Sequence, residues 1–305
     1  MAGAKAAVRP AGKGFWRRNR GLLYVMPWLI GFIIFKGLPF ISSLYYSAMD
    51  YNLFKTDSSF VGLGNYATIL DTKKYINAYK VTFLYAFITV PLKLMFSLFI
   101  AYILNFNIKF VKGFRTIYYI PSILGSSVAI SVVWKSIFNS TGLVNKALGF
   151  IGIDEINWLG SSKTAIWVIC LLKIWQFGSA MVIFLAALKG VPTSLYEAAA
   201  IDGAGKWKQF TRITLPMITP VIFYNLVTQL CEAFQEFNSA YLITKGGPLG
   251  STTLISLLVY QNAFKSYDMG MACAMAWILF LIVGIFSAVA FISQKYWVYY
   301  SDDGR

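Results

Sequence analysis

Polar side chains recur at helical spacing inside one of the apolar stretches of this chain. Gln229, Glu232 and Glu236 are spaced i, i+3 and i+7, so they share one face of a helix. Carboxylate and amide groups are costly within a bilayer, where they usually face a bundle interior or a cavity. Two interpretations follow: the three side chains bind a polar solute, or they join neighbouring helices through hydrogen bonds and ion pairs.

A second polar island covers residues 197–205, which read Glu-Ala-Ala-Ala-Ile-Asp-Gly-Ala-Gly. Ser194 and Glu197 have the spacing of a capping box, which predicts a helix that starts at Ser194 and ends before a hinge at Gly203. A second short helix is expected over 206–214. The alanines let another surface approach the backbone, which suits a helix that docks in a partner's groove. The alternative is an ordinary interfacial loop in which Glu197 only caps its own helix.

The composition excludes several classes of chemistry. The chain has no histidine, and its three cysteines all fall in apolar stretches, which indicates small buried side chains rather than disulfides. No dense cluster of cysteines or carboxylates predicts a metal site. The Gly-x-x-x-x-Gly-Lys-Ser/Thr pattern that binds ATP phosphates is absent from the sequence. We therefore expect no metal, no cofactor and no catalytic site in this chain.

Hydropathy identifies a polytopic, all-α membrane protein. The 305 residues are 58% hydrophobic and 13% charged, about half the charged fraction of a typical soluble domain. The apolar residues form continuous blocks, each long enough for a helix to cross a bilayer. The six expected spans are 22–46, 79–104, 116–138, 164–188, 216–243 and 270–293.

Lysine and arginine predict the orientation of these spans. With the N-terminus inside, 15 of the 27 basic residues lie on the inner side and eight lie in outer loops. The positive-inside rule then places both termini and residues 189–215 in the cytoplasm, and it explains the net charge of +15 without nucleic acid. We expect a basic tail over 1–21, a membrane domain with six spans over 22–295 and a short tail over 296–305.

The expected outer loops, 50–78, 139–163 and 244–269, are too short for a separate domain. The last one contains the turn Gly246-Gly247-Pro248, followed by an amphipathic run over 252–264. We expect that run to form a short interfacial helix.

The island at Glu197 resembles the EAA loop of ABC-importer permeases. Glu197 and two alanines are followed six residues after the glutamate by Gly203, and then by Ile213-Thr214-Leu215-Pro216. Further segments resemble permeases of oligosaccharide importers similar to the larger maltose-transporter subunit: 60–66, 114–121, Trp134, 138–145 and 244–248. The resemblance covers roughly residues 20–295, but the extra spans and large outer domain of the maltose subunit are missing, as in smaller sugar permeases of the family.

The resemblance implies the fold, partners and compartment. It implies a type I ABC-importer permease fold with cytoplasmic coupling helices, in a bacterial cytoplasmic membrane. It also implies a second, homologous permease as a heterodimer partner, two ATP-binding cassette ATPase subunits that hold ATP and Mg, and an extracytoplasmic solute-binding protein that delivers an oligosaccharide.

The resemblance also assigns candidate site residues. ATPase coupling maps onto Glu197 and Gly203, with Ala198, Ala199 and Asp202 on the same face or hinge. Counting back from the Gly-Gly-Pro turn places sugar contacts at Gln229, Glu232, Ala233 and Glu236. Counting back from Glu197 places further contacts near Leu172, Trp175, Gln176 and Ser179. Trp175 then stacks on a sugar ring or packs at the membrane interface, while Gln176 and Ser179 bind hydroxyl groups.

Lys93 and Lys173 lie deep within expected spans. They neutralise Glu232 and Glu236, or they face an acidic oligosaccharide such as a uronate fragment. A transporter coupled to protons or sodium is the alternative from another class, because Glu232 and Glu236 could carry the ion. Neither an inverted repeat nor a catalytic constellation is recognisable, which weighs against this alternative and against a membrane enzyme.

Overall fold

The computed structural model describes residues 20–55, 57–106, 109–125 and 127–300. These residues form helices and π-helical turns (η) and a two-stranded antiparallel hairpin. The elements of the first half of the chain are α2 (Arg20–Phe32), η1 (Ile33–Gly37), α3 (Leu38–Ser47), β1 (Met49–Asp50), β2 (Ser59–Phe60), α4 (Gly64–Asp71), α5 (Lys73–Asn105), α6 (Val111–Leu124), α7 (Val128–Ile137) and α8 (Leu143–Phe150). The remainder are α9 (Ala165–Trp175), α10 (Gly178–Gly190), α11 (Thr193–Ile201), α12 (Lys206–Gln209), η2 (Phe210–Thr214), α13 (Leu215–Met217), α14 (Thr219–Phe234), η3 (Ala240–Thr244), α15 (Ile255–Phe264) and α16 (Met269–Trp297).

The described part of the chain holds three helices that are long and apolar enough to cross a membrane: Tyr24–Ser47, α5 and α16. Three bent pairs also qualify if each counts as one span. They are α6 with α7, bent by 101°, α9 with α10, bent by 41°, and Lys206–Met217 with α14, bent by 63°. In order along the chain they match the six predicted spans. The fifth span departs from the prediction of a helix up to Ile243, because α14 ends at Phe234 and η3 follows a break.

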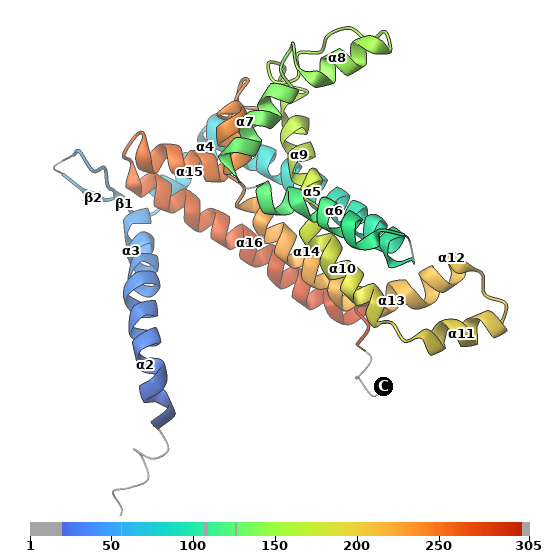
Figure 1. Cartoon of the computed structure of the whole chain (residues 1–305). Coiled ribbons are helices and arrows are strands. Elements are labelled where there is room, and N and C mark those ends of the chain that lie inside the picture. The colour runs from blue at the N-terminus through green and yellow to red at the C-terminus, as the bar shows by residue number, and fades with distance from the viewer. Residues whose placement is uncertain (1–19, 56, 107–108, 126, 301–305) are drawn as a thin grey trace, which may run out of the picture.

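The centre of the bundle is α5, which packs against α9, α10, α14 and α15 (Figure 1). Its neighbours approach closely because small side chains lie at the contacts: Ala86, Ala180 and Ala233 are all buried. Between them, Tyr85, Phe184 and Phe234 belong to the main hydrophobic cluster and are almost fully buried. Close packing of small residues is how helices associate in lipid, where burial of apolar surface gives little driving force.

The first span stands apart from the other helices (Figure 1). The most apolar 18 residues of this span include no buried residue. The span contacts the bundle where α3 packs against α16. There Trp277 Nε1 donates a hydrogen bond to Ser43 Oγ at 3.1 Å. The apolar side chains of α2 therefore point away from this chain, as those of a lipid-exposed helix do.

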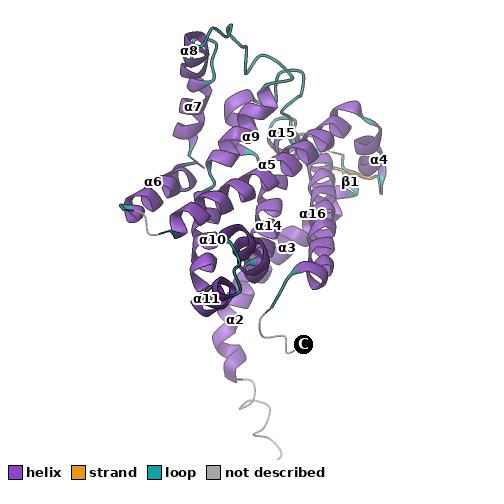
Figure 2. Cartoon of the chain, turned by 90° about the vertical axis from the view of Figure 1, so that its right-hand side faces the viewer, coloured by secondary structure: helices purple, strands orange, loops and turns teal. Residues whose placement is uncertain are grey.

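The two ends of the bundle differ. One end carries the hairpin, α4, α8 and α15, and the opposite end carries α11 and the C-terminal end of α16 (Figure 2). The predicted helix over 252–264 is present as α15. The hairpin was not predicted. The segment that leads from α3 into β1 is stabilised by Asn65, whose Nδ2 donates to the carbonyls of Ser47 and Met49 at 2.9 Å each.

Candidate functional site

Three of the spans are interrupted around one cavity. The interruptions lie between α6 and α7, between α9 and α10, and between α14 and η3. Each one leaves backbone groups without a partner in their own helix. Such groups are tolerated at membrane depth only where they are buried in protein or line a cavity. Broken spans that meet at one place are also the usual way in which transporters build a solute site.

Side chains from neighbouring spans satisfy the exposed backbone groups. Gln176 Nε2 donates to the carbonyl of Gly125 at 3.0 Å, and Ser122 Oγ donates to the carbonyl of Gln176 at 3.1 Å. The amide of Ser179 donates in turn to Ser122 Oγ at 3.0 Å. The breaks in the third and fourth spans are thus tied together by reciprocal hydrogen bonds. These bonds hold the two breaks in one fixed geometry.

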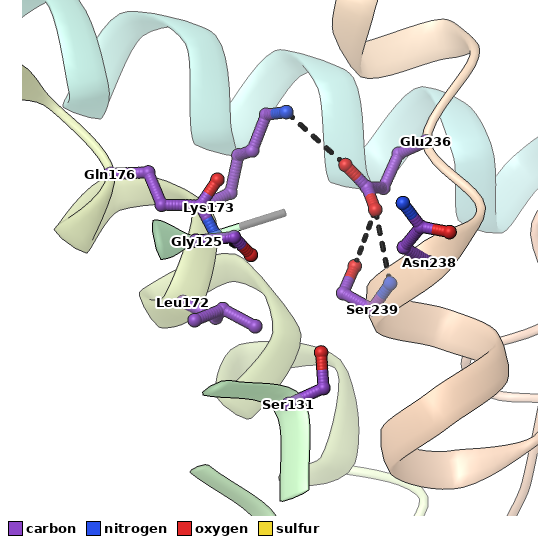
Figure 3. A pocket seen from close by; sticks show the side chains of 8 residues that line it. All are labelled: Gly125, Ser131, Leu172, Lys173, Gln176, Glu236, Asn238 and Ser239. Carbon is purple, nitrogen blue, oxygen red and sulfur yellow. Dashed lines mark hydrogen bonds and ion pairs between the residues drawn. The ribbon is translucent and has the colours of Figure 1, made fainter. Parts of the chain in front are cut away.

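The cavity at these breaks is lined by polar groups from three spans (Figure 3). The lining residues are Gly125, Ser131, Leu172, Lys173, Gln176, Glu236, Asn238 and Ser239. Its volume is about 110 Å³, below the ≈ 300–1,000 Å³ of ordinary small-molecule pockets. A second, more open pocket of about 320 Å³ adjoins it and shares Lys173, Glu236 and Asn238 with it. This chain alone therefore supplies part of a cavity wall rather than an enclosed binding site.

Three ion-paired side chains, those of Lys173, Glu232 and Glu236, lie where the two pockets adjoin. Lys173 Nζ lies 3.2 Å from Glu236 Oε2 and 3.8 Å from Glu232 Oε2. The side chains of Lys173 and Glu236 are 15% and 12% exposed, whereas that of Glu232 is 54% exposed. Glu236 Oε1 also accepts hydrogen bonds from the amide and hydroxyl of Ser239, at 3.1 and 2.9 Å (Figure 3). Both oxygens of Glu236 are therefore engaged, while Glu232 makes the longer and more exposed contact.

The structure brings only some of the predicted solute-contact residues to the cavity. Lys173, Gln176 and Glu236 line it, and Glu232 lines the adjoining pocket. Leu172 also lies on the cavity wall.

The remaining predicted contacts lie elsewhere. Gln229 and Ala233 are buried between helices. The Trp175 ring packs on Trp134, with ring centroids 5.5 Å apart. Ser179 contributes its backbone amide to the helix break described above.

Lys173 is ion-paired with both glutamates, as one interpretation expected, whereas Lys93 makes no direct ion pair with either of them among the described residues. Lys93 Nζ donates to Gln229 Oε1 at 2.5 Å. Gln229 lies within α14, whereas Glu236 follows the end of that helix at Phe234, so the two side chains meet different neighbours. The helix α5 brings Lys93 to the level of Gln229.

Sequence reasoning missed Gly125, Ser131, Asn238 and Ser239 as cavity residues. A signal existed for Asn238 and Ser239, which form a polar pair near the end of an otherwise apolar span. Gly125 and Ser131 carry no comparable signal. They reach the cavity only because the third span bends sharply between α6 and α7.

The Glu197 island forms a projecting pair of short helices, as predicted. Glu197, Ala198, Asp202 and Gly203 are exposed and Ala199 is half-buried. The predicted capping box is absent: α11 begins at Thr193 after Pro192, and its N-terminus has no side-chain cap. Pro192 is in an extended conformation and places the helix start one residue earlier, so Ser194 lies inside the first turn instead of before it.

The C-terminus of α11 is closed by a Schellman motif. Gly203 has φ +73°, its amide donates to the carbonyl of Ala200 at 3.1 Å, and the amide of Ala204 donates to that of Ala199 at 2.8 Å. A side chain in this left-handed conformation is strained, which explains the glycine. The motif reverses the chain between α11 and α12 and holds the carboxylates of Glu197 and Asp202 at the exposed end of the molecule.

Comparison with known proteins identifies the family. A family model described as "Binding-protein-dependent transport system inner membrane component" matches residues 61–298. The chain belongs to this family. It is accordingly a multi-pass membrane protein and a permease component of an ABC importer that works with a solute-binding protein. The family and the helical fold predicted from the sequence are thus confirmed.

Relatives in this family span nearly the whole chain. The probable ABC transporter permease protein YesP of Bacillus subtilis is 45% identical over 92% of this chain and 92% of its own length. The trehalose/maltose transport system permease protein MalF of Thermococcus litoralis is 33% identical over 88% of this chain and 91% of its own length.

Solved structures resemble the chain equally broadly. One is a bacterial ABC transporter involved in the import of the acidic polysaccharide alginate, with a TM-score of 0.77, 27% identity and coverage of 92% of this chain and 97% of that chain. Another is a bacterial alginate ABC transporter in complex with an alginate pentasaccharide-bound periplasmic protein, with a TM-score of 0.78 and 26% identity.

Proposed function

We propose that this chain is one of two permease subunits of an ATP-driven importer of oligosaccharides. The observation that carries the proposal is the cavity at the three broken spans, polar in a chain that is otherwise apolar, in a member of a binding-protein-dependent family. Amide, hydroxyl and charged groups converge there from three spans, and such groups suit the hydroxyls of a sugar. The sugar transport named for relatives such as MalF supports the class of solute.

Partner chains supply the rest of the machine in this proposal. A second, homologous permease completes the cavity, whose own volume is too small for an oligosaccharide. An ATPase dimer binds ATP and Mg, since this chain has no phosphate-binding loop. The ATPase docks on Glu197, Ala198, Ala199, Asp202 and Gly203. Both termini and the docking helices face the cytoplasm of a bacterial cell, and a solute-binding protein delivers the sugar from outside.

Movement of the docking helices changes the side of the membrane to which the cavity is open. Nucleotide binding closes the ATPase pair, displaces α11 and opens the cavity toward the loaded binding protein. Hydrolysis returns the cavity to the cytoplasmic side. Each state is favoured by its own differential contacts, nucleotide on one side and loaded binding protein on the other.

Lys173 gives the site a preference for acidic sugars in this proposal. Glu236 is held by Ser239 as well as by Lys173, whereas Glu232 is exposed and makes only the 3.8 Å contact with Lys173. A sugar carboxylate therefore replaces Glu232 beside Lys173 without disturbing Glu236. The resemblance to alginate importers supports this choice.

The first test is affinity purification of the tagged chain in mild detergent, wild type beside Glu197→Ala. We expect an ATPase and a second permease with the wild type, and about tenfold less ATPase with the variant, the effect of losing about 1.4 kcal/mol of binding. Recovery of both forms without any partner, with sugar uptake intact in cells depleted of the ATPase, would refute the proposal and favour the ion-coupled alternative.

The acidic preference has a separate test. Uptake of uronate oligosaccharides and of neutral oligosaccharides is compared in Lys173→Arg and Lys173→Gln variants. We expect Lys173→Gln to lose acidic uptake selectively and Lys173→Arg to retain it. Unchanged acidic uptake in Lys173→Gln would remove Lys173 from the solute site and leave the importer itself in place.

A further inference from the structure

The docking helix α11 touches the rest of the protein through one side chain in particular. No residue of α11 is fully buried among those described. Tyr196 is half-buried and packs against the main hydrophobic cluster of the bundle. Its hydroxyl lies 2.8 Å from Thr214 Oγ1, and Thr214 is only 4% exposed. A side chain of the projecting helix thus makes a hydrogen bond inside the membrane domain.

Thr214 is the last residue of the π-helical turn η2, from which the fifth span continues through α13 and α14. Pro216 explains the turn, because proline supplies no amide hydrogen and its ring displaces the carbonyl four residues earlier. Extra residues in a helical turn are common at functional sites. A displacement of Thr214 therefore reaches α14, which carries Glu232.

A second hydrogen bond stabilises the turn between α11 and α12. Gln209 is 6% exposed, and its Nε2 donates to the carbonyl of Ala204 at 2.9 Å. This bond holds the turn after α11 against α12. It leaves α11 itself joined to the fifth span by the connecting chain and by the Tyr196 hydroxyl.

Little else restrains α11 on its inner side. A pocket of about 260 Å³ lies between the end of α5, with Tyr102 and Asn105, and the docking segment, with Tyr196 and Gln209. Because this space is not filled by side chains, α11 has room to tilt about its connections. Tyr196 and Thr214 both line this space, and the hydrogen bond between them is a direct connection from α11 to the fifth span at its wall.

We propose that Tyr196 is a positioning residue that transmits the displacement of α11 to the fifth span through its hydrogen bond with Thr214. The proposal rests on the proposed function of α11 as the ATPase docking helix. It assigns docking and transmission to different side chains: Glu197 holds the ATPase, and the neighbouring tyrosine carries the movement inward.

The test uses the purified complex of this chain with its ATPase and second permease. A cysteine at exposed Gln235, at the end of α14, reports movement when the three native cysteines are replaced by alanine. Its labelling rate is measured without nucleotide and with ATP and vanadate. The variants are Tyr196→Phe, Thr214→Val and the pair together. Tyr224→Phe, at an exposed tyrosine on α14, is the matched control.

We expect Tyr196→Phe and Thr214→Val each to reduce the nucleotide-dependent change in labelling by about three- to tenfold, the factor typical of one hydrogen bond. The double variant should be no worse than either single one, because both remove the same bond. ATPase recovery and melting temperature should match those of Tyr224→Phe.

A full labelling response in Tyr196→Phe, or additive losses in the double variant, would overturn the proposal. Failure of the wild-type chain to recover any ATPase would instead refute the proposed function. The two failures are thus distinguishable in one experiment.

Discussion

Lys173 Nζ and Glu236 Oε2 lie 3.2 Å apart although 63 residues separate them in the sequence. The pair joins the fourth span just before its break to the fifth span just after the end of α14. The backbone carbonyl of Glu236 also accepts a hydrogen bond from Ser256 on α15. Glu236 thereby connects α9, the segment before η3 and α15. Substitution by glutamine removes its charge and keeps the shape of the side chain.

Glu236→Gln should destabilise the protein by about 1.5–3 kcal/mol, the usual range for losing a hydrogen bond to a charged group. Glutamine can still accept from Ser239, so the loss reports the partner Lys173. Thermal unfolding followed by tryptophan fluorescence in detergent measures it. Glu232→Gln is the matched control, because exposed ion pairs contribute little. Equal shifts for the two variants would contradict the separate roles assigned to the glutamates.

Gly178→Ala should lower stability and transport together. A Cβ at this position would meet the carbonyl oxygen of Tyr118 and lie 2.8 Å from Tyr119 Cα, so backbone rather than a flexible side chain must move. Overpacking of this kind costs about 1–3 kcal/mol. Gly284→Ala, in the exposed middle of α16 with no atom within 4 Å, should be neutral or stabilising. Unfolding midpoints and uptake rates of both variants test this, and a harmless Gly178→Ala would mean that α6 and α10 are not tightly apposed.

Gly203→Ala should weaken ATPase recovery because the left-handed conformation at φ +73° costs a β-carbon about 1 kcal/mol. No neighbouring atom lies within 4 Å, so the effect is conformational and not steric. Gly203→Asn should restore part of the binding, since asparagine tolerates this conformation. Gly205→Ala, where φ is −66°, should leave recovery unchanged. Should Gly205→Ala be as harmful as Gly203→Ala, the Schellman turn would not be the determinant.

Asn145→Leu should loosen the loop that follows α8. Asn145 Nδ2 donates to the carbonyls of Ser140 and Ile156 at 2.9 and 2.8 Å, and its Oδ1 accepts from Trp158 Nε1 at 2.9 Å. Leucine removes all of these bonds, and each is worth about 0.5–1.5 kcal/mol because the partner groups are exposed or half-buried. Faster amide exchange over residues 151–163 would show the loss. Asn139→Ala, at an exposed asparagine, is the control and should leave exchange there unchanged.

Much of the architecture could be predicted from local sequence. The order of six spans follows from apolar blocks whose length matches the bilayer. The projecting pair α11 and α12 follows from residues within a short segment, where Gly203 permits the left-handed turn between them. Even there, the start of α11 was misplaced by one residue, since Pro192 and not a serine side chain decides where the helix begins.

The cavity was predictable only in part. A polar face expected along the fifth span indicated Glu232 and Glu236, but the same periodicity included Gln229, which the structure buries against Lys93. Periodicity identifies a shared face and not the depth at which each residue meets a neighbouring helix. The pairing of Lys173 with Glu236 depends on the relative heights of two spans, which no local pattern encodes.

The sequence by itself determined the membrane class, the order of the spans and the position of the projecting helices α11 and α12, because hydropathy, charge and turn-forming residues act over short stretches of chain. The tertiary structure alone decided where the spans break. The break between α6 and α7 is held because Gln176, from another span, satisfies the carbonyl of Gly125. A broken helix is stable in a bilayer only when distant residues supply the hydrogen bonds that it lacks, so its position is a property of the packed bundle.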